Sequence, residues 1–190
     1  MRDYIAEKWK PALEQNNLRT FDDFWNLKTG WFEPPNKGRG GWSGVARCEL
    51  NHPVGGTSCV FLKRQENYIT RNWRHPFRGV PTLRREFLNI LRYRARGIPT
   101  LTPVYYAERR IGRNRQAVLV TEELAGFRSL RDCVREWERS GWPPRETKLQ
   151  IIETVADTLR AIHRSHLRHK SFSPNTFSCG STPTGDCKRA

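Results

Sequence analysis

The apolar residues of the chain recur with two different periods, and each period predicts one kind of secondary structure. Short alternating or continuous apolar runs predict strands at residues 44–50, 57–65, 102–110 and 116–124. Apolar residues three or four positions apart predict helices at residues 82–97, 129–140 and 145–167. The order is therefore two strands, a long helix, two more strands and two further helices, which is an α+β pattern.

Spacing also predicts which side chains share a face of each element. The predicted shared faces are Ala46, Cys48 and Leu50 on the first strand, Leu83, Phe87, Ile90 and Leu91 on the first long helix, and Leu149, Ile152, Val155, Leu159 and Ile162 on the last helix. Thr20 and Ser129 stand at predicted helix starts, and Gly97 stands at a predicted helix end. Residues 3–28 are expected to form one or two short helices, and residues 65–80 a polar loop.

Composition narrows the class of protein. The 190 residues are 36% hydrophobic and 11% aromatic, which is enough for a folded core in one domain or two small lobes. The net charge of +15 predicts a surface that attracts polyanions, such as nucleic acids, anionic lipid headgroups or phosphorylated sugars. Five cysteines without a CxxC pair argue against a disulfide framework or a zinc site and favour a reducing cytoplasm. No apolar run is long enough to span a membrane, and the N-terminus lacks the apolar core of a secretory signal, so membrane attachment is expected to be peripheral.

A glycine-rich turn precedes the first predicted strand. Its candidate cofactor-binding residues are Gly38, Gly40, Gly41 and Ser43. Glycine permits close approach and unusual dihedral angles, so main-chain N–H groups in this turn can reach phosphate oxygens. A plain hairpin turn between two strands explains the same glycines, and the turn alone does not decide between these readings.

Charged residues elsewhere can complete a nucleotide site. Lys63 ends an apolar strand, where its stem can pack inside while its ammonium group reaches a ligand. Glu86, on the next predicted helix, can pair with Lys63 and hold it toward phosphates. The alternatives are a strand-edge lysine that reaches solvent and a solvated glutamate beside Arg85. The main chain of Glu122 and Leu124 can hydrogen-bond an adenine edge, although an ordinary strand exit has the same sequence.

The order of these parts carries more information than any one of them. Protein kinases have a glycine loop, a strand lysine, a helix glutamate, a strand pair, a connector and a long helix that leads into a histidine-containing loop. The same order is present here. A P-loop nucleotide site is excluded because the chain contains no GxxxxGK(S/T) sequence.

Five segments between about residues 25 and 175 carry the most specific sequence of the chain. They are RGGWSGVARCEL, VFLKRQENY, REFLNILRYRARGIPTLTPVYYAER, VLVTEELAGFRSL and LRAIHRSHLRHKSF. Together they resemble the bacterial lipopolysaccharide core kinases of the InaA and WaaP type. The resemblance implies a protein-kinase-like fold, with a five-stranded antiparallel N-lobe carrying one long helix and the first helices of an incomplete helical C-lobe.

The same resemblance implies a reaction. Members of this family transfer the γ-phosphoryl group of ATP, with Mg²⁺, to an inner-core sugar of lipopolysaccharide at the cytoplasmic face of the inner membrane. By this resemblance Lys63 is the phosphate-binding lysine and Glu86 is its partner. The expected partner of the protein is the lipopolysaccharide core glycolipid or another anionic surface.

The closing stretch departs from the resemblance. His169 and Ser171 are the candidate catalytic residues, but Ser171 stands where the resemblance places the catalytic aspartate, and serine cannot act as a carboxylate base. No aspartate on an apolar strand follows, so no metal-binding residue is predicted. Reading the codons after Pro174 one nucleotide out of step gives a strand, a turn and a strand, so a frameshift, a truncation and a genuine divergent tail stay open. This chain is expected to be inactive in phosphoryl transfer, with the apolar face of its last helix partly uncovered.

The predicted organisation has four segments. They are an N-terminal helical segment (residues 1–28), a kinase-like N-lobe (29–124), the start of a C-lobe (125–177) and an aberrant or disordered tail (178–190).

Two other functions stay open as alternatives. A pseudokinase or nucleotide-binding scaffold agrees with Ser171, and a basic nucleic-acid-binding protein agrees with the net charge. The arginines at residues 82–96 are spread around their helix rather than gathered in one stripe, so nucleic acid is the less favoured partner. A Ser171–His169 nucleophile lacks an accompanying oxyanion motif.

Overall fold

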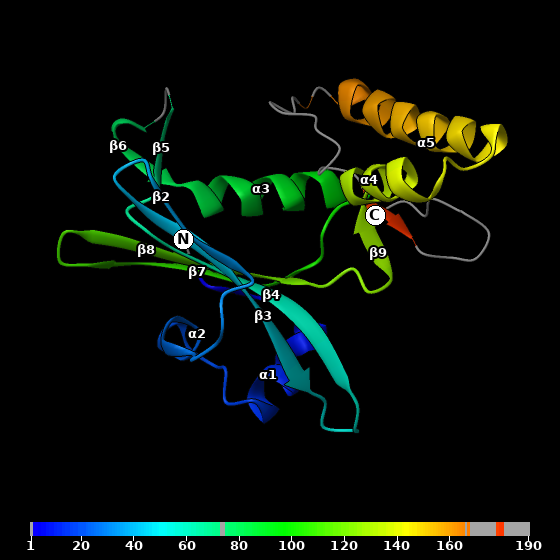
Figure 1. Ribbon diagram of the computed structural model, residues 1–190. Helices are drawn as coiled ribbons and strands as arrows, with labels where there is room; N and C mark the ends of the chain where they lie inside the picture. The colour runs from blue at the N-terminus through cyan, green and yellow to red at the C-terminus, as the bar shows by residue number, and fades with distance from the viewer. Residues whose placement is uncertain (1, 73–74, 166, 168–177, 181–190) are drawn as a thin grey trace. The chain divides into compact units, whose positions relative to one another are not determined.

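The computed structural model describes residues 2–72, 75–165, 167 and 178–180 of the chain (Figure 1). The chain divides into two compact units, Met1–Leu91 with Thr102–Glu123 and Arg92–Leu101 with Leu124–Ala190. The first unit contains a sheet and the elements that cover it. The second contains two helices and two short strands.

A six-stranded antiparallel sheet forms the centre of the first unit, with the order β1-β7-β8-β4-β3-β2. Its strands are β1 (Tyr4–Ile5), β2 (Glu33–Gly38), β3 (Gly41–Asn51), β4 (Thr57–Glu66), β7 (Pro103–Ile111) and β8 (Asn114–Glu122). The predicted α+β class and the antiparallel sheet are confirmed, but the sheet has six strands where the resemblance implies five. Neither β2 nor the two-residue strand β1, which pairs with β7, was predicted from the sequence.

The predicted polar loop, residues 65–80, is instead largely strand: Gln65 and Glu66 end β4, and two further strands follow. β5 (Ile69–Asn72) and β6 (His75–Pro81) pair antiparallel as a separate two-stranded ribbon. Thr70 and Val80 lie opposite each other in this ribbon, and both are buried. A two-stranded ribbon buries few side chains, so its sequence shows no sustained apolar alternation.

The N-terminal segment covers one face of the sheet with η1 (Glu7–Trp9), α1 (Lys10–Gln15) and α2 (Phe21–Asn26). The short helices predicted for this segment are therefore confirmed. Its buried side chains and those of the sheet form one core, which contains Trp9, Ala12, Leu13, Leu18, Phe21, Phe24, Ala46, Cys48, Leu50, Val60, Leu62, Val104, Tyr105, Ala107, Val118 and Val120. Removing this apolar surface from water is the main stabilising contribution to the unit.

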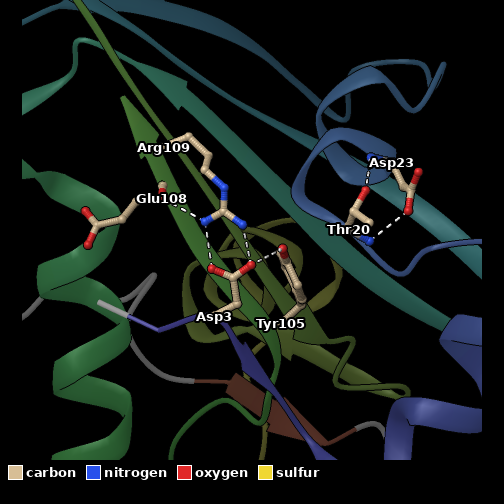
Figure 2. A network of polar contacts seen from close by, with 6 residues as sticks. All are labelled: Asp3, Thr20, Asp23, Tyr105, Glu108 and Arg109. Atoms are coloured by element: carbon tan, nitrogen blue, oxygen red, sulfur yellow. Dashed lines mark hydrogen bonds and ion pairs between the residues drawn. The ribbon is translucent and has the colours of Figure 1, made fainter. Parts of the chain in front are cut away.

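Two polar networks fix this segment (Figure 2). Arg109 of β7 donates hydrogen bonds to both carboxylate oxygens of Asp3, at 2.7 and 2.5 Å, and the Tyr105 hydroxyl donates to the same group at 3.5 Å. Thr20 caps α2 as predicted: its hydroxyl accepts from the N–H of Asp23, whose carboxylate accepts from the N–H of Thr20. The N–H of Thr20 is the chief cause of the lowered pKa of Asp23.

The opposite face of the sheet is covered by α3 (Thr82–Arg94). Two neighbouring tyrosines of β7 show the division, because successive residues of a strand point to opposite faces. Tyr105 stacks on Phe24 of α2 with 4.1 Å between ring centroids, and Tyr106 stacks on Phe87 of α3 at 4.4 Å. Burial raises the pKa of both tyrosine hydroxyls above its usual range. The buried residues of α3 are Leu83, Phe87 and Ile90, as predicted, and the predicted fourth, Leu91, is half-buried.

The second unit contains β9 (Phe127–Ser129), α4 (Leu130–Ser140), α5 (Arg145–Arg164) and β10 (Ser178–Gly180). Ser129 caps α4 as predicted, accepting a hydrogen bond from the N–H of Asp132 at 3.1 Å. The apolar face predicted for α5 is partly uncovered, as expected: Leu149 and Ile152 are 47% and 62% exposed, whereas Ile162 is 4% exposed. Ile151, outside the predicted face, is 7% exposed. Spacing identifies an apolar face but not the neighbour that covers it. Among the described helices, none is both long and apolar enough to cross a membrane.

Candidate nucleotide-binding site

Lys63 lies near the middle of the sheet, on β4 between Val45 of β3 and Leu119 of β8. Its Nζ is 2.5 Å from Oε1 of Glu86, on α3. The two side chains keep 25% and 34% of their surface exposed. The structure thus brings together the two charged residues predicted for the site, in an ion pair that solvent and a ligand can still reach.

A buried glutamine holds the helix that carries Glu86. Gln65 lies two residues after Lys63 on β4, so both side chains point to the α3 face of the sheet. Its Oε1 accepts from the N–H of Leu83 at 3.0 Å, and its Nε2 donates to the carbonyl of Tyr68 at 3.0 Å. Leu83 precedes Glu86 by three residues, about one turn, so Gln65 and Lys63 hold consecutive turns of the same helix face.

Thr82 strengthens the same anchor at the start of α3. Its N–H and its hydroxyl both donate to the carbonyl of Tyr68, at 3.1 and 3.0 Å. Gln65 is fully buried, with 0% exposure, so its satisfied amide fixes the helix start firmly. Sequence reasoning missed Gln65, although a second polar residue on the face of Lys63, in an otherwise apolar strand, was a visible signal.

The predicted glycine turn is the β2–β3 hairpin connection. Gly38 pairs with Gly41, and the two residues between them, Arg39 and Gly40, have φ of 52° and 84°. Positive φ at both central residues defines a type I′ turn, which matches the twist of a hairpin. A Cβ atom on Gly41 would lie 1.9 Å from the carbonyl oxygen of Glu66 on β4. The turn and this close packing account for the glycines, and their contact with phosphate stays a prediction.

Ser43 lies on the same face of the sheet as the ion pair. It is opposite Gln65 in the β3–β4 register, and Val45 is opposite Lys63. Residues directly opposite each other in an antiparallel pair project to the same side. The structure therefore places Ser43 beside the predicted site.

Glu122 and Leu124, at and just after the end of β8, do not join the Lys63–Glu86 pair through their side chains. The carboxylate of Glu122 accepts a hydrogen bond from the indole N–H of Trp9 at 2.5 Å and pairs with Lys8. Glu122 is opposite Val60, so its side chain lies on the face away from Lys63. The carbonyl of Leu124, in the second unit, accepts from the N–H of Phe127. The carboxylate of Glu122 is thus used by the N-terminal segment, and a contact of its main chain or that of Leu124 with adenine stays a prediction.

The next residue, Glu123, forms a forked ion pair on the Lys63 face of the sheet. Arg47 of β3 donates from Nε and Nη2 to the two carboxylate oxygens of Glu123, each at 2.8 Å. These hydrogen bonds lower the pKa of Glu123. The N–H of Glu123 also donates to the carbonyl of Cys59, which fixes the end of β8 against β4.

The predicted catalytic residues His169 and Ser171 lie outside the described residues. Within the described part of the chain, no group of three or more His, Cys, Asp or Glu side chains is arranged to hold a metal ion. The expected Mg²⁺ therefore stays a prediction, without a ligand set that can be named.

Comparison with known proteins decides the family. Residues 22–179 match the model of the lipopolysaccharide kinase (Kdo/WaaP) family. The chain belongs to this family. Membership implies that ATP is the phosphoryl donor of the family reaction, and it confirms the resemblance seen in the sequence.

Individual relatives agree with this assignment. The chain is 29% identical over 149 residues to protein InaA of Escherichia coli, covering 78% of this chain and 66% of InaA. It is 35% identical over 88 residues to the lipopolysaccharide core heptose(I) kinase WaaP of Pseudomonas aeruginosa, covering 46% of this chain and 32% of WaaP. The chain thus spans less than two thirds of the length of either relative.

A solved structure shows the same fold. WaaP in complex with acyl carrier protein matches 86% of this chain and 57% of its own chain, with a TM-score of 0.56 and 24% sequence identity. The protein-kinase-like architecture predicted from the order of the elements is therefore confirmed.

Proposed function

We propose that this chain carries the nucleotide-binding lobe for ATP-dependent phosphoryl transfer to an inner-core sugar of lipopolysaccharide. The observation that carries the proposal is the ion pair between Lys63 and Glu86, which Gln65 and Thr82 hold in place. The family supports the reaction class, and the heptose kinase named among the relatives supports a core sugar as acceptor. The lipopolysaccharide core glycolipid, met by a peripheral protein at the cytoplasmic face of the inner membrane, is part of the same proposal.

The residues present fit a triphosphate. The Nζ of Lys63 provides a compact positive charge with three donors, and Glu86 uses one direction while leaving others for phosphate oxygens. Because Gln65 fixes the start of α3, the ammonium group is already oriented before a ligand arrives. ATP would supply the transferable γ-phosphoryl group, and the chain's own residues would orient its phosphates over the sheet.

A second function is favoured by one residue of the sequence. Ser171 stands where the family resemblance places the catalytic base, and a serine hydroxyl does not accept a proton as a carboxylate does. We therefore propose that this chain binds the nucleotide with little or no phosphoryl transfer. The two proposals share the Lys63 site and differ only in turnover.

Titration calorimetry of the 190-residue chain with MgATP tests the shared site. We expect Lys63→Met to weaken binding roughly tenfold to a hundredfold, because it removes charge-assisted hydrogen bonds worth about 1.5–3 kcal/mol. Lys28→Met, at an exposed position before β2, is the matched control and should bind as the wild type does. Equal affinity in all three proteins would disprove a nucleotide site at Lys63.

Turnover separates the two functions. Release of ADP with a lipopolysaccharide core acceptor, absent in Lys63→Met, would establish phosphoryl transfer by this chain. Tight MgATP binding without ADP release would establish the nucleotide-binding scaffold.

A further inference from the structure

Two hairpin turns and the turn after β4 meet at one end of the six-stranded sheet. The β2–β3 turn reaches β5 through Arg39, whose Nη1 donates to the Thr70 hydroxyl at 3.4 Å and whose guanidinium lies 5.6 Å from the ring centroid of Tyr68, just before β5. The turn after β4 contacts the β7–β8 connection through Asn67, whose amide donates to Asn114 at 2.9 Å. Hydrogen bonds thus link neighbouring hairpins into one surface rather than leaving three separate tips.

The third link joins the β5–β6 ribbon to β8. Arg115 donates from Nη1 to the carbonyl of Gly79 at 2.8 Å, and its own N–H donates to the side chain of Asn67 at 2.9 Å. We call this surface the basic end, and it is defined by five exposed residues on the three hairpins, Lys37, Arg39, Arg71, Arg110 and Arg113.

The charges of the basic end are not balanced by neighbours. Within the described part of the chain, none of its five basic side chains forms an ion pair with a carboxylate. Glu66, at the same end of β4, accepts a hydrogen bond from the amide of Gln116 at 2.6 Å. Arg39 and Arg110 contact only polar or aromatic groups in the contacts described, Thr70 and Tyr68 for the former and the Gly112 carbonyl for the latter.

The opposite end of the same sheet is balanced. Arg47 pairs with Glu49 and Glu123, and Lys8 pairs with Glu122. The hairpin tip there, residues 52–56, contains the 97% exposed Val54 and no Lys, Arg, Asp or Glu. Unpaired positive charge is therefore found at one end of the sheet only, among the described residues, and is not a general property of its hairpin tips.

The β7–β8 connection adds an apolar side chain to the basic end. Ile111 is 55% exposed and lies between Arg110 and the turn residues Gly112 and Arg113. An aliphatic tip between arginines fits the boundary between lipid headgroups and acyl chains, where the aliphatic group leaves water and the arginines meet phosphates. A nucleic acid strand would instead call for exposed aromatic platforms. The two aromatic residues that the structure describes here, Tyr68 and Trp42, are half-buried, with Tyr68 under the guanidinium of Arg39 and Trp42 against the rings of Trp25 and Trp31.

We propose that the basic end docks on the surface of a membrane rich in anionic phospholipid, with Ile111 entering the headgroup region. The five basic side chains would be attracted to lipid phosphates, and the hydrogen bonds among the hairpins would spare the cost of ordering them on binding. The inference rests on the peripheral membrane location in the proposed function and names the surface that would make the contact. It does not require nucleotide binding or phosphoryl transfer, so vesicle binding can fail while MgATP binding holds, and the reverse.

Vesicle co-sedimentation of the 190-residue chain tests the proposal, with vesicles of pure phosphatidylcholine and vesicles with about one third phosphatidylglycerol. The wild type should bind the anionic vesicles, much less the neutral ones, and more weakly in high salt because screening shortens the attraction. The double variant Arg110→Gln/Arg113→Gln should bind the anionic vesicles roughly 30-fold more weakly, taking about 1 kcal/mol for each basic residue at the surface and 1.4 kcal/mol for each factor of ten.

Matched control variants show whether binding depends on the basic end itself or only on the net charge of the protein. Arg19→Gln/Lys28→Gln removes two exposed charges of the same unit away from the basic end and should change binding less than about twofold by the same estimate. Ile111→Ser should weaken binding by roughly fivefold, because its apolar surface no longer leaves water, whereas Val54→Ser should not. Thermal unfolding of each variant at the wild-type temperature would show that the fold is retained.

Three results would overturn the proposal. The first is a wild type that does not bind anionic vesicles. The second is an equal loss in the two double variants, which would make the attraction a matter of net charge alone. The third is a mixed-sequence single-stranded RNA that binds more tightly than the vesicles and loses its binding in Arg110→Gln/Arg113→Gln, which would make the basic end a nucleic-acid site.

Discussion

β4 directs Val60, Leu62 and Arg64 to one face of the sheet and Phe61, Lys63 and Gln65 to the other. On the first face, Arg64 is 8% exposed and donates to the carbonyls of Trp25 and Leu27 at 2.9 Å each. Burial lowers the pKa of its guanidinium. Lys63, the adjacent residue on the other face, instead pairs with a carboxylate and keeps a quarter of its surface exposed.

The difference between these neighbours separates a structural cation from a functional one. Arg64 is surrounded by protein: its Nη1 donates to two main-chain carbonyls at the end of α2 and its Nη2 to the Thr29 hydroxyl, while its Nε has no hydrogen-bond partner among the described residues. Its described contacts therefore hold α2 against the sheet. The Lys63 side chain is 25% exposed, and its carboxylate partner among the described residues, Glu86, is 34% exposed. A cation that binds phosphate needs this second arrangement, because a ligand must replace solvent around it without breaking the fold.

The largest expected effect on stability comes from a substitution on the face of the sheet that α2 covers. Phe24 is 1% exposed and stacks on Tyr105, so Phe24→Ala should lower the free energy of unfolding by about 3–5 kcal/mol. Urea unfolding followed by tryptophan fluorescence measures the loss. The folded fraction should bind MgATP as the wild type does, because the substitution lies on the face away from Lys63. A loss of affinity beyond the unfolded fraction would show that the two faces are coupled.

A substitution on the Lys63 face should lower stability less but should also weaken MgATP binding, which the α2 face is not expected to affect. Gln65→Met leaves the N–H of Leu83 buried without its acceptor, which should cost about 1–3 kcal/mol in the free energy of unfolding. MgATP affinity should fall in the same variant, because α3 no longer holds Glu86 against Lys63.

Gln116→Met is the matched control for this prediction. Gln116 is also buried in the sheet, but within the described residues its Oε1 has no partner and its Nε2 donates to Glu66. Removing the unpartnered Oε1 offsets part of the lost hydrogen bond to the Glu66 carboxylate, so the substitution should cost less than Gln65→Met and leave MgATP affinity unchanged. If both variants lose affinity equally, Gln65 acts through the stability of the sheet and not through the position of α3.

The sequence predicted helix starts and strand faces well, because these features depend on residues close together in the chain. Thr20 and Ser129 cap helices as expected, and Ala46, Cys48 and Leu50 lie on one buried face, because caps and alternation depend on neighbours within a few positions. Strands β1 and β2 and the β5–β6 ribbon were missed because they show no sustained apolar alternation and local spacing does not reveal their pairing partners. The partly uncovered apolar face of α5 was expected, but burial of Ile151, outside that face, was not, because packing against other elements decides which residues are covered.

The candidate site also contains residues that the sequence predicted and residues that it did not. Lys63 and Glu86 were predicted, because the order of elements along the chain brings a strand lysine opposite a helix glutamate. Gln65 was not, because its role depends on the exact placement of the Leu83 N–H and the Tyr68 carbonyl, which no sequence pattern specifies. Nor did the sequence show that the carboxylate of Glu122 faces Trp9, since that contact joins residues 113 positions apart.

The smallest expected effect concerns the exposed ion pair on the Lys63 face. Arg47 lowers the pKa of Glu123 below its ordinary value of 4.5 through two hydrogen bonds. A carboxylate with a lowered pKa in the folded state stabilises the fold above its ordinary pKa, and this contribution is lost as the pH falls through the lower, folded-state value. The wild type should therefore unfold at a slightly higher temperature than Glu123→Gln at pH 7, with the difference vanishing as the pH falls below about 4.5.

Salt gives the independent check of this last effect. Both side chains of the pair reach solvent, with 40% of Arg47 and 23% of Glu123 exposed, so the difference in unfolding temperature should shrink in high salt. MgATP affinity should be the same in Glu123→Gln and the wild type, because the pair does not touch Lys63 or Glu86. A difference that does not shrink as the pH falls below about 4.5 would mean that Glu123 acts through shape or main-chain contacts. In that case the two faces of the sheet would differ in how tightly their residues pack, and a charged side chain on the more exposed face would not by itself indicate a functional position.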